Sequence, residues 1–180
     1  LHGMTALEYV ESASEFELAE VLREYGEEPR FRKVARAIAE ARAAGKIATT
    51  TDLANAIAAA APSHERIHPA TRAFQAIRIK VNDELGQIER ALPKAFEALE
   101  NGGVLAAISF HSLEDRIVKK FFKKMAGRPE SRFDTSYVQD RVKLAELITR
   151  KPVIPTDEEI AENPRSRSSK LRAIRKDTAR

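Results

Sequence analysis

A cluster of polar side chains follows a short apolar run in the second half of the chain. The run, VLAAI, covers residues 104–108 and is preceded by two glycines, which would end a helix. An apolar run of this length is typical of a buried strand. Ligands bind outside the carboxyl ends of strands in open α/β sheets, so the polar residues that follow are a candidate site. They lie within seven positions: Ser109, His111, Ser112, Glu114 and Asp115.

Much of this cluster also has a structural explanation. From Leu113 on, the apolar positions have helical spacing. Ser112 would then be a natural N-cap, and the acidic residues Glu114 and Asp115 would favour the helix dipole. A Ser–His–Asp hydrolase is not supported, because the three groups lie within one turn and have no oxyanion-hole pattern.

The capping and spacing patterns of the first hundred residues predict helices. Capping-box patterns open the first two: Thr5 with Glu8, and Ser14 with Glu17. Pro29 stands at a first-turn position of a third helix. The chain is therefore expected to be predominantly helical.

Two further helices precede the apolar run. Thr51 can cap an alanine-rich helix. Pro69 begins the longest predicted helix, in which apolar residues three or four apart continue to Leu99. Gly86 and Pro93 are the positions where this helix could bend.

The strands predict an incomplete sheet. Besides residues 104–108, only residues 144–150 and 171–175 have a strand pattern. A continuous apolar strand indicates burial on both faces of a mostly parallel sheet. Such a strand needs a neighbour on each side for its backbone groups, and this chain offers few.

Three segments carry a resemblance to a known family. Residues 108–122, ISFHSLEDRIVKKFF, resemble the signature of the RsmH (MraW) family of small-subunit ribosomal RNA cytosine-N4 methyltransferases. Residues 68–85 and 158–171 agree with the same family. A near-continuous match of this length is more specific than a spaced motif.

The resemblance implies a fold class and a domain organisation. The expected fold is α/β: the C-terminal part of a class I (Rossmann-like) methyltransferase sheet, with a mostly α-helical inserted domain. On this basis residues 1–66 are the helical insert, of the substrate-recognition type. Residues 67–180 are the C-terminal part of the Rossmann-like domain, with the long helix, about three strands and a basic tail.

The resemblance also implies S-adenosyl-L-methionine as the cofactor, and here the sequence departs from the family pattern. Family members bind the cofactor through a glycine-rich turn after the first strand. None of the seven glycines here forms a GxG turn between a strand and a helix. We therefore expect the chain to be a C-terminal fragment of such an enzyme and to contain no cofactor-binding residues. We also expect negligible methyl transfer by the fragment alone.

The resemblance gives the polar cluster a chemical role. Methylating the exocyclic amine of cytosine requires a proton acceptor, an aligned methyl group and an unstacked base. His111 is the candidate acceptor, and Ser109 or Ser112 could hold the base edge. Asp115 could orient the imidazole of His111 or simply begin the helix, and His111 could instead make a purely structural hydrogen bond.

The resemblance implies small-subunit ribosomal RNA as the partner, and basic blocks in the sequence agree with a surface that faces RNA. Residues 116–132 and 165–180 each hold seven Lys or Arg and a single acidic residue, in a chain of pI ≈ 9.4. Such blocks bind phosphate without reading sequence, although each alone is also typical of a solvated face. The candidate RNA-binding residues are Arg32, Lys33, Arg36, Arg72, Arg78, Lys119, Lys120, Lys123 and Lys124.

Composition limits the other classes. The chain has no cysteine, so disulfides and thiolate metal sites are excluded, and His64 and His68 are separated by a loop rather than paired on a helix. No apolar run is long enough to span a bilayer, and we expect a cytoplasmic protein. Two alternatives stay open: a noncatalytic RNA-binding module and a purely structural helical domain.

Overall fold

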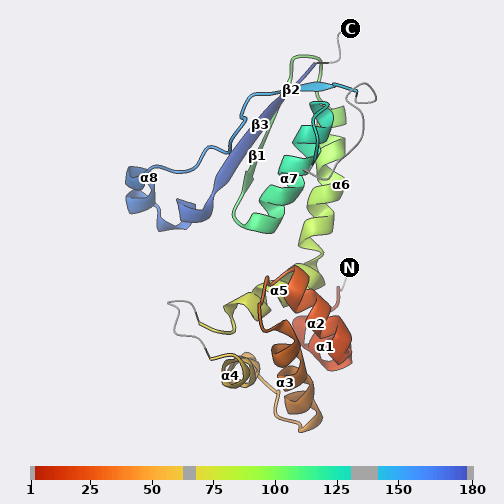
Figure 1. Ribbon diagram of the computed structural model, residues 1–180, viewed down its shortest axis with the longest axis vertical. Helices are drawn as coiled ribbons and strands as arrows, with labels where there is room; N and C mark the ends of the chain where they lie inside the picture. Colours follow the sequence, from red (N-terminus) through yellow and green to blue (C-terminus); the bar gives the residue numbers. More distant parts are fainter. Residues whose placement is uncertain (1–2, 63–67, 131–141, 178–180) are drawn as a thin grey trace. The chain divides into compact units, whose positions relative to one another are not determined.

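The chain forms two compact units, Leu1–Glu84 and Leu85–Arg180. The computed structural model describes residues 3–62, 68–130 and 142–177 (Figure 1). The division falls later than residue 66, where we expected it. The helix after Pro69 packs with the N-terminal helices, since Ala73, Ala76 and Ile77 belong to their core.

The first unit is a bundle of helices: α1 (Ala6–Ser12), α2 (Glu15–Glu24), α3 (Phe31–Ala43), α4 (Thr50–Ala60) and α5 (Thr71–Asn82). Its core is built from residues such as Leu22, Val34, Ile38 and Ile57, which have almost no exposed surface. The capping boxes predicted at Thr5 and Ser14 are confirmed.

The cap of α4 is Thr49 rather than Thr51. The Thr49 side chain accepts from the N–H of Asp52, and the Asp52 carboxylate accepts from the N–H of Thr49 at 2.8 Å. The prediction failed because three consecutive threonines can each serve as a cap, and only one has its acidic partner three positions on.

The expected long helix is two helices. Asp83 adopts the left-handed conformation, with φ of 48°, and ends α5; α6 (Glu84–Glu97) follows at once. Neither Gly86 nor Pro93 marks the break. Pro93 is tolerated inside α6, and an aspartate can adopt the left-handed conformation that stops a helix.

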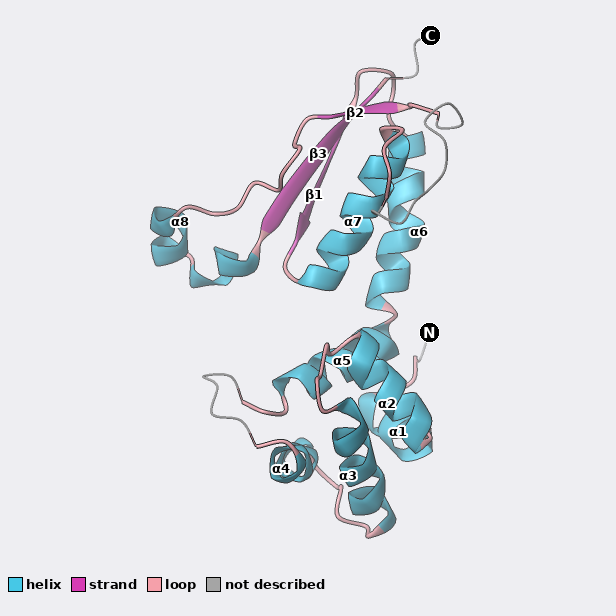
Figure 2. Ribbon diagram, viewed as in Figure 1, coloured by secondary structure: helices cyan, strands magenta, loops and turns pink. Residues whose placement is uncertain are grey.

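The second unit has a two-layer α/β architecture (Figure 2). Besides α6 it contains β1 (Val104–Ser109), α7 (Ser112–Met125), β2 (Ala145–Leu147), α8 (Asp157–Glu162), a 3₁₀ turn (Pro164–Ser168) and β3 (Lys170–Lys176). All three expected strands are present, so the mixed α/β class is confirmed. Side chains of α6 and α7, including Leu92, Phe96 and Phe122, pack with Ile174 of β3 against one face of the sheet.

The sheet has the order β1-β3-β2, and both pairings are antiparallel. The parallel pairing that we expected is therefore not seen among the described strands. On β3, Leu171 exchanges hydrogen bonds of 2.9 Å with Val153, and the Ala173 carbonyl accepts from Ile148 at 3.0 Å. Odd-numbered residues of β3 thus point their backbone groups away from β1, and even-numbered residues point theirs toward it.

This alternation leaves one edge of β1 open. Leu105 and Ala107 lie opposite even-numbered β3 residues, so their N–H groups point toward β3. The N–H groups of Val104, Ala106 and Ile108 point to the opposite edge, where no described strand pairs with them. The same three side chains lie on the face away from the helices, where Val104 is 48% and Ile108 59% exposed. The expected burial on both faces is not seen in the described residues.

Candidate functional site

An ion pair anchors the polar cluster to the sheet. Asp115, in the first turn of α7, accepts two hydrogen bonds from the Arg172 guanidinium of β3, at 2.7 and 3.0 Å. Both side chains are largely buried, with 13% and 10% exposed. These hydrogen bonds hold the pKa of Asp115 below its ordinary value, against the opposing effect of burial. Asp115 therefore fixes the start of α7 on the centre of the sheet.

His111, rather than Ser112, is the N-cap of α7. Its Nδ1 accepts from the N–H of Glu114 at 3.4 Å, and the Glu114 carboxylate accepts from the N–H groups of Phe110 at 2.8 Å and His111 at 3.3 Å. The prediction of Ser112 as the cap was wrong because His111 is still extended, with ψ of 166°, and Ser112 already lies inside the helix.

The cap arrangement limits what His111 can do chemically. Since Nδ1 accepts a hydrogen bond, the neutral imidazole carries its proton on Nε2. That atom is buried and has no well-aligned hydrogen-bond partner among the described residues, although Glu114 Oε1 lies 3.3 Å away. In this tautomer Nε2–H can donate a hydrogen bond, and the lone pair of Nδ1 is already engaged by the N–H of Glu114. The geometry therefore suits a positioning role for His111 better than that of a general base.

The two serine candidates lie in different environments. Ser109 is 4% exposed, and its Oγ donates to the Lys170 carbonyl across the sheet at 3.4 Å. Ser112 is exposed at the start of α7. Between them lies Phe110, which no sequence pattern marked as a candidate; it is 56% exposed, next to His111. An aromatic residue after a strand is too common a pattern to have marked it.

A small cavity of about 350 Å³ adjoins the buried end of this cluster. It lies between α6, β1 and α7, and its polar side chains are Ser109 and Glu114. The remaining lining is apolar and includes Ile88, Ala91, Leu92, Leu105, Ala107 and Val118.

The glycine pair before β1 does not form a cofactor cradle. Gly102 has φ of +83°, and a Cβ added to Gly103 would lie 2.9 Å from the Glu100 carbonyl oxygen. Both glycines are thus required by the tight turn that joins α6 to β1. The connection from β1 to α7 contains no glycine, and its N–H groups bind Glu114. Neither segment is therefore a glycine-rich turn of the kind that holds S-adenosylmethionine between a strand and a helix.

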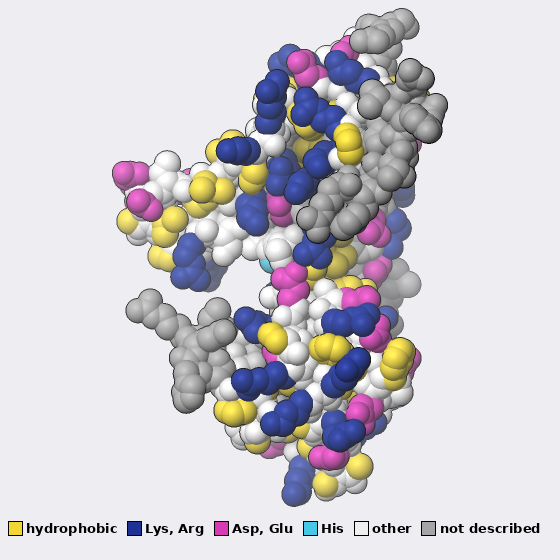
Figure 3. Space-filling model, in the orientation of Figure 1, with side chains coloured by type: hydrophobic (Ala, Val, Ile, Leu, Met, Phe, Trp, Pro, Cys, Tyr) yellow, Lys and Arg dark blue, Asp and Glu magenta, His cyan; other side chains and the backbone are white. Residues whose placement is uncertain are grey.

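The four predicted lysines of α7 lie on one basic helix face with Arg116. Lys119, Lys120 and Lys124 are exposed and Lys123 is half-buried. Figure 3 shows Lys and Arg side chains gathered over the sheet region of this unit. We call the residues Arg116, Lys119, Lys120, Lys123 and Lys124 the α7 basic face.

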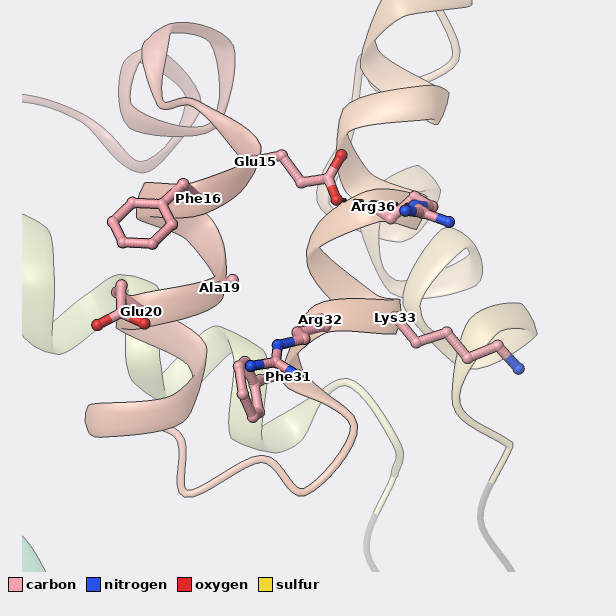
Figure 4. A pocket seen from close by; sticks show the side chains of 8 residues that line it. All are labelled: Glu15, Phe16, Ala19, Glu20, Phe31, Arg32, Lys33 and Arg36. Carbon is pink, nitrogen blue, oxygen red and sulfur yellow. Dashed lines mark ion pairs between the residues drawn. The ribbon is translucent and has the colours of Figure 1, made fainter.

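The predicted basic residues of the first unit do not all lie together. Arg32, Lys33 and Arg36 share one wall of a groove between α2 and α3 (Figure 4). On α5, Arg78 is held by Glu84 through hydrogen bonds of 2.8 and 3.1 Å, and Arg72 is half-buried. The α3 residues are the more accessible group.

Part of the basic tail is structural. Arg172 is bound to Asp115, and Lys176 donates to the carbonyls of Phe96, Glu97 and Leu99 at 3.2, 3.1 and 2.6 Å. Lys176 thereby satisfies carbonyls at the C-terminal end of α6. Sequence spacing could not show this, because the partners are nearly eighty residues apart.

The described part of the chain contains no group of three or more metal-ligating side chains and no helix long and apolar enough to cross a bilayer. His68 Nδ1 accepts from the N–H of Ala70 at 3.1 Å, next to the start of α5. His64 lies outside the described residues.

These features define a mixed α/β protein whose polar cluster follows a strand and adjoins a basic helix. Comparison with known proteins specifies the family. The model of the MraW methylase family matches residues 2–177, and the chain therefore belongs to that family.

Curated relatives are similar over nearly the whole chain. Each carries the name ribosomal RNA small subunit methyltransferase H. The relative from Methylobacterium nodulans is 50% identical over 95% of this chain and 52% of its own length. That from Nitrosococcus oceani is 49% identical over 98% of this chain and 56% of its own. The chain thus spans about half the length of the curated relatives it matches.

Proposed function

We propose that this chain is the C-terminal part of an S-adenosylmethionine-dependent methyltransferase that modifies the N4 amine of a cytidine in 16S ribosomal RNA. The observation that carries the proposal is the family match over residues 2–177, with relatives named as small-subunit ribosomal RNA methyltransferases. A cytoplasmic location follows from this substrate.

The open edge of β1 supports a larger sheet. Val104, Ala106 and Ile108 direct backbone groups to an edge that no described strand pairs with, and their side chains leave an apolar face exposed. In a class I methyltransferase, strands from the other half of the protein would lie along this edge. That half would supply the glycine-rich turn for the cofactor, since none of the seven glycines of this chain stands in a GxG turn between a strand and a helix.

At the end of β1, this chain would position the cytidine. The cap formed by His111 and Glu114 fixes the backbone of the connection from β1 to α7, and the Asp115–Arg172 pair holds that helix on the sheet. Phe110 and Ser112 are the exposed side chains of the connection. They could contact a base that has been unstacked from the RNA.

The α7 basic face would bind the RNA backbone. Its cations lie on one helix and mostly in solvent, where long basic side chains bind phosphates with little sequence preference. The same surface also favours a second candidate, a noncatalytic RNA-binding module. A methyl-transfer experiment separates the two.

The experiment measures transfer of labelled methyl groups from S-adenosylmethionine to small-subunit ribosomal RNA. It compares the 180-residue chain alone with the chain mixed with the half of the Methylobacterium nodulans relative that it does not match. We expect no turnover by the chain alone and labelling of cytidine N4 by the mixture. Turnover by the chain alone would contradict the need for a second half. RNA binding by a correctly associated mixture that transfers no methyl group would favour the noncatalytic module.

A further inference from the structure

The groove between α2 and α3 combines aromatic and charged side chains. It has a volume of about 640 Å³. Figure 4 shows side chains of α2 on one side and of α3 on the other. The lining residues are Glu15, Phe16, Ala19, Glu20, Phe31, Arg32, Lys33 and Arg36.

Phe16 presents its ring to solvent on the α2 side of this groove. It is 73% exposed, more than any other large apolar side chain in the described residues. Exposing a phenyl ring is unfavourable, and a ring on a helix surface offers a flat face for stacking. The α2 side thus carries an aromatic ring that is mostly uncovered by the described residues.

Phe31, on the α3 side, is already stacked with cations. The guanidinium carbon atoms of Arg32 and Arg23 lie 5.2 and 5.9 Å from its ring centroid. This stacking holds the Arg32 guanidinium beside the groove, as Figure 4 shows. Arginine planes and aromatic rings are the groups on which unpaired bases stack.

The charges of the groove are available for a ligand. Arg36 and Glu15 lie 3.7 Å apart, with 69% and 50% of their side chains exposed, so their ion pair is weak and exchangeable. Lys33 makes no ion pair within the described part of the chain and extends into solvent (Figure 4). Of the two carboxylates, Glu20 accepts a hydrogen bond of 2.6 Å from Arg23, and Glu15 is the one whose exposed ion pair can be exchanged for a base amino group.

We infer that this groove binds a single-stranded segment of RNA. A base stacks on Phe16, and the phosphates of the segment lie along Arg32, Lys33 and Arg36. This inference rests on the proposed function, since it assumes an RNA substrate. It adds a contact with unpaired nucleotides on the first unit, separate from the α7 basic face, which would contact backbone only.

The test measures fluorescence anisotropy of labelled oligonucleotides with the 180-residue chain. The probes are a single-stranded segment of small-subunit ribosomal RNA and the same segment in a duplex. Stacking of one base is worth ~1–3 kcal/mol, so Phe16→Leu should weaken single-strand binding roughly 5- to 150-fold and leave duplex binding unchanged. Leucine keeps the apolar surface and removes only the ring. Lys33→Ala should weaken binding of the single strand and lower its salt dependence.

Two matched variants serve as controls. Leu7→Ala removes another exposed apolar side chain, 48% exposed on α1, and Lys46→Ala removes an exposed cation beyond the other end of α3. Neither should change the affinity for either probe. Thermal unfolding of Phe16→Leu should match the wild type, because the ring packs on little.

The outcomes distinguish failure of the groove inference from failure of the proposed function. Unchanged single-strand affinity of Phe16→Leu, or an equal loss for single strand and duplex, would overturn the groove inference. A protein partner that binds the groove and is lost in Phe16→Leu, with RNA affinity intact, would overturn it as well. If the wild-type chain binds no ribosomal RNA at all, the proposed function itself fails.

Discussion

Asp115 binds Arg172 across 57 positions of sequence, through two hydrogen bonds of 2.7 and 3.0 Å. The pair joins the first turn of α7 to the middle strand of the sheet. It therefore sets the position of the connection that carries Phe110, His111 and Ser112.

Replacing Asp115 should destabilise the second unit in a pH-dependent way. Asp115→Asn leaves the Arg172 charge largely buried without its partner, which should cost about 3 kcal/mol in the free energy of unfolding at pH 7. The folded-state pKa of Asp115 is lowered, so its stabilisation is fully present above the ordinary aspartate pKa and is lost as pH falls through the folded value. Urea titrations should show the gap between wild type and variant closing below about pH 4.

Asp157→Asn is the matched control for this prediction. Asp157 is exposed in the first turn of α8, and its replacement should change stability by less than about 0.5 kcal/mol. A loss in Asp115→Asn that is the same at pH 3 and pH 7 would show that the charge of Asp115 is not what matters.

Replacing His111 should show that its side chain stabilises the protein as the N-cap of α7. His111→Ala removes the acceptor for the N–H of Glu114 and should cost about 1 kcal/mol, whereas His111→Asn supplies another capping side chain and should recover most of it. Thermal unfolding measures both. Equal destabilisation by alanine and asparagine would show that capping is not the role of this side chain.

Local sequence patterns predicted most helices and strands. The contacts that they did not predict are mainly between residues far apart in the sequence. The boxes at Thr5 and Ser14 involve residues three apart, so their spacing is visible in the sequence. The Asp115–Arg172 pair depends on the register of β3 against β1, which no local pattern reports. The same reason explains why Asp115 was assigned only to the helix dipole or to the imidazole.

The errors at helix ends had a different cause. Asp83 ends α5 by adopting a left-handed conformation, which aspartate tolerates but does not require. Likewise, histidine is a rarer N-cap than serine, so the sequence favoured Ser112. Only the backbone direction after β1 decides that His111 is the cap. In each case the sequence allowed two close alternatives, and tertiary packing chose one.

Arg42 should prove to be structural, although its position on α3 suggests a surface cation. Its Nη1 donates to the carbonyls of Val10, Glu11 and Ala13 at 2.8, 3.2 and 2.6 Å, which joins α3 to the end of α1. Arg42→Ala should destabilise the first unit by about 2 kcal/mol, because hydrogen bonds from a charged group are lost. Lys33→Ala, on an exposed part of the same helix, should not. Equal unfolding midpoints for the two variants would contradict this role.

Neutralising the α7 basic face should weaken RNA binding and should make the remaining affinity less dependent on salt concentration. In a variant with Lys119, Lys120 and Lys124 changed to alanine, the slope of log affinity against log salt should fall in magnitude by about 2 for single-stranded RNA. The control changes Lys46, Lys94 and Lys151, which are exposed elsewhere. A similar slope for both triple variants would indicate that RNA affinity depends only on the net charge of the protein.

If β1 is an inner strand of a larger sheet, amide hydrogen exchange at its open edge should slow when the neighbouring strands are supplied. In the 180-residue chain alone, the N–H groups of Ala106 and Ile108 should exchange quickly, while those of Leu105 and Ala107, which face β3, are protected. After the complementary half of the Methylobacterium nodulans relative is added, Ala106 and Ile108 should become protected too. Fast exchange at these two residues in a mixture that transfers methyl groups would show that β1 is an edge strand.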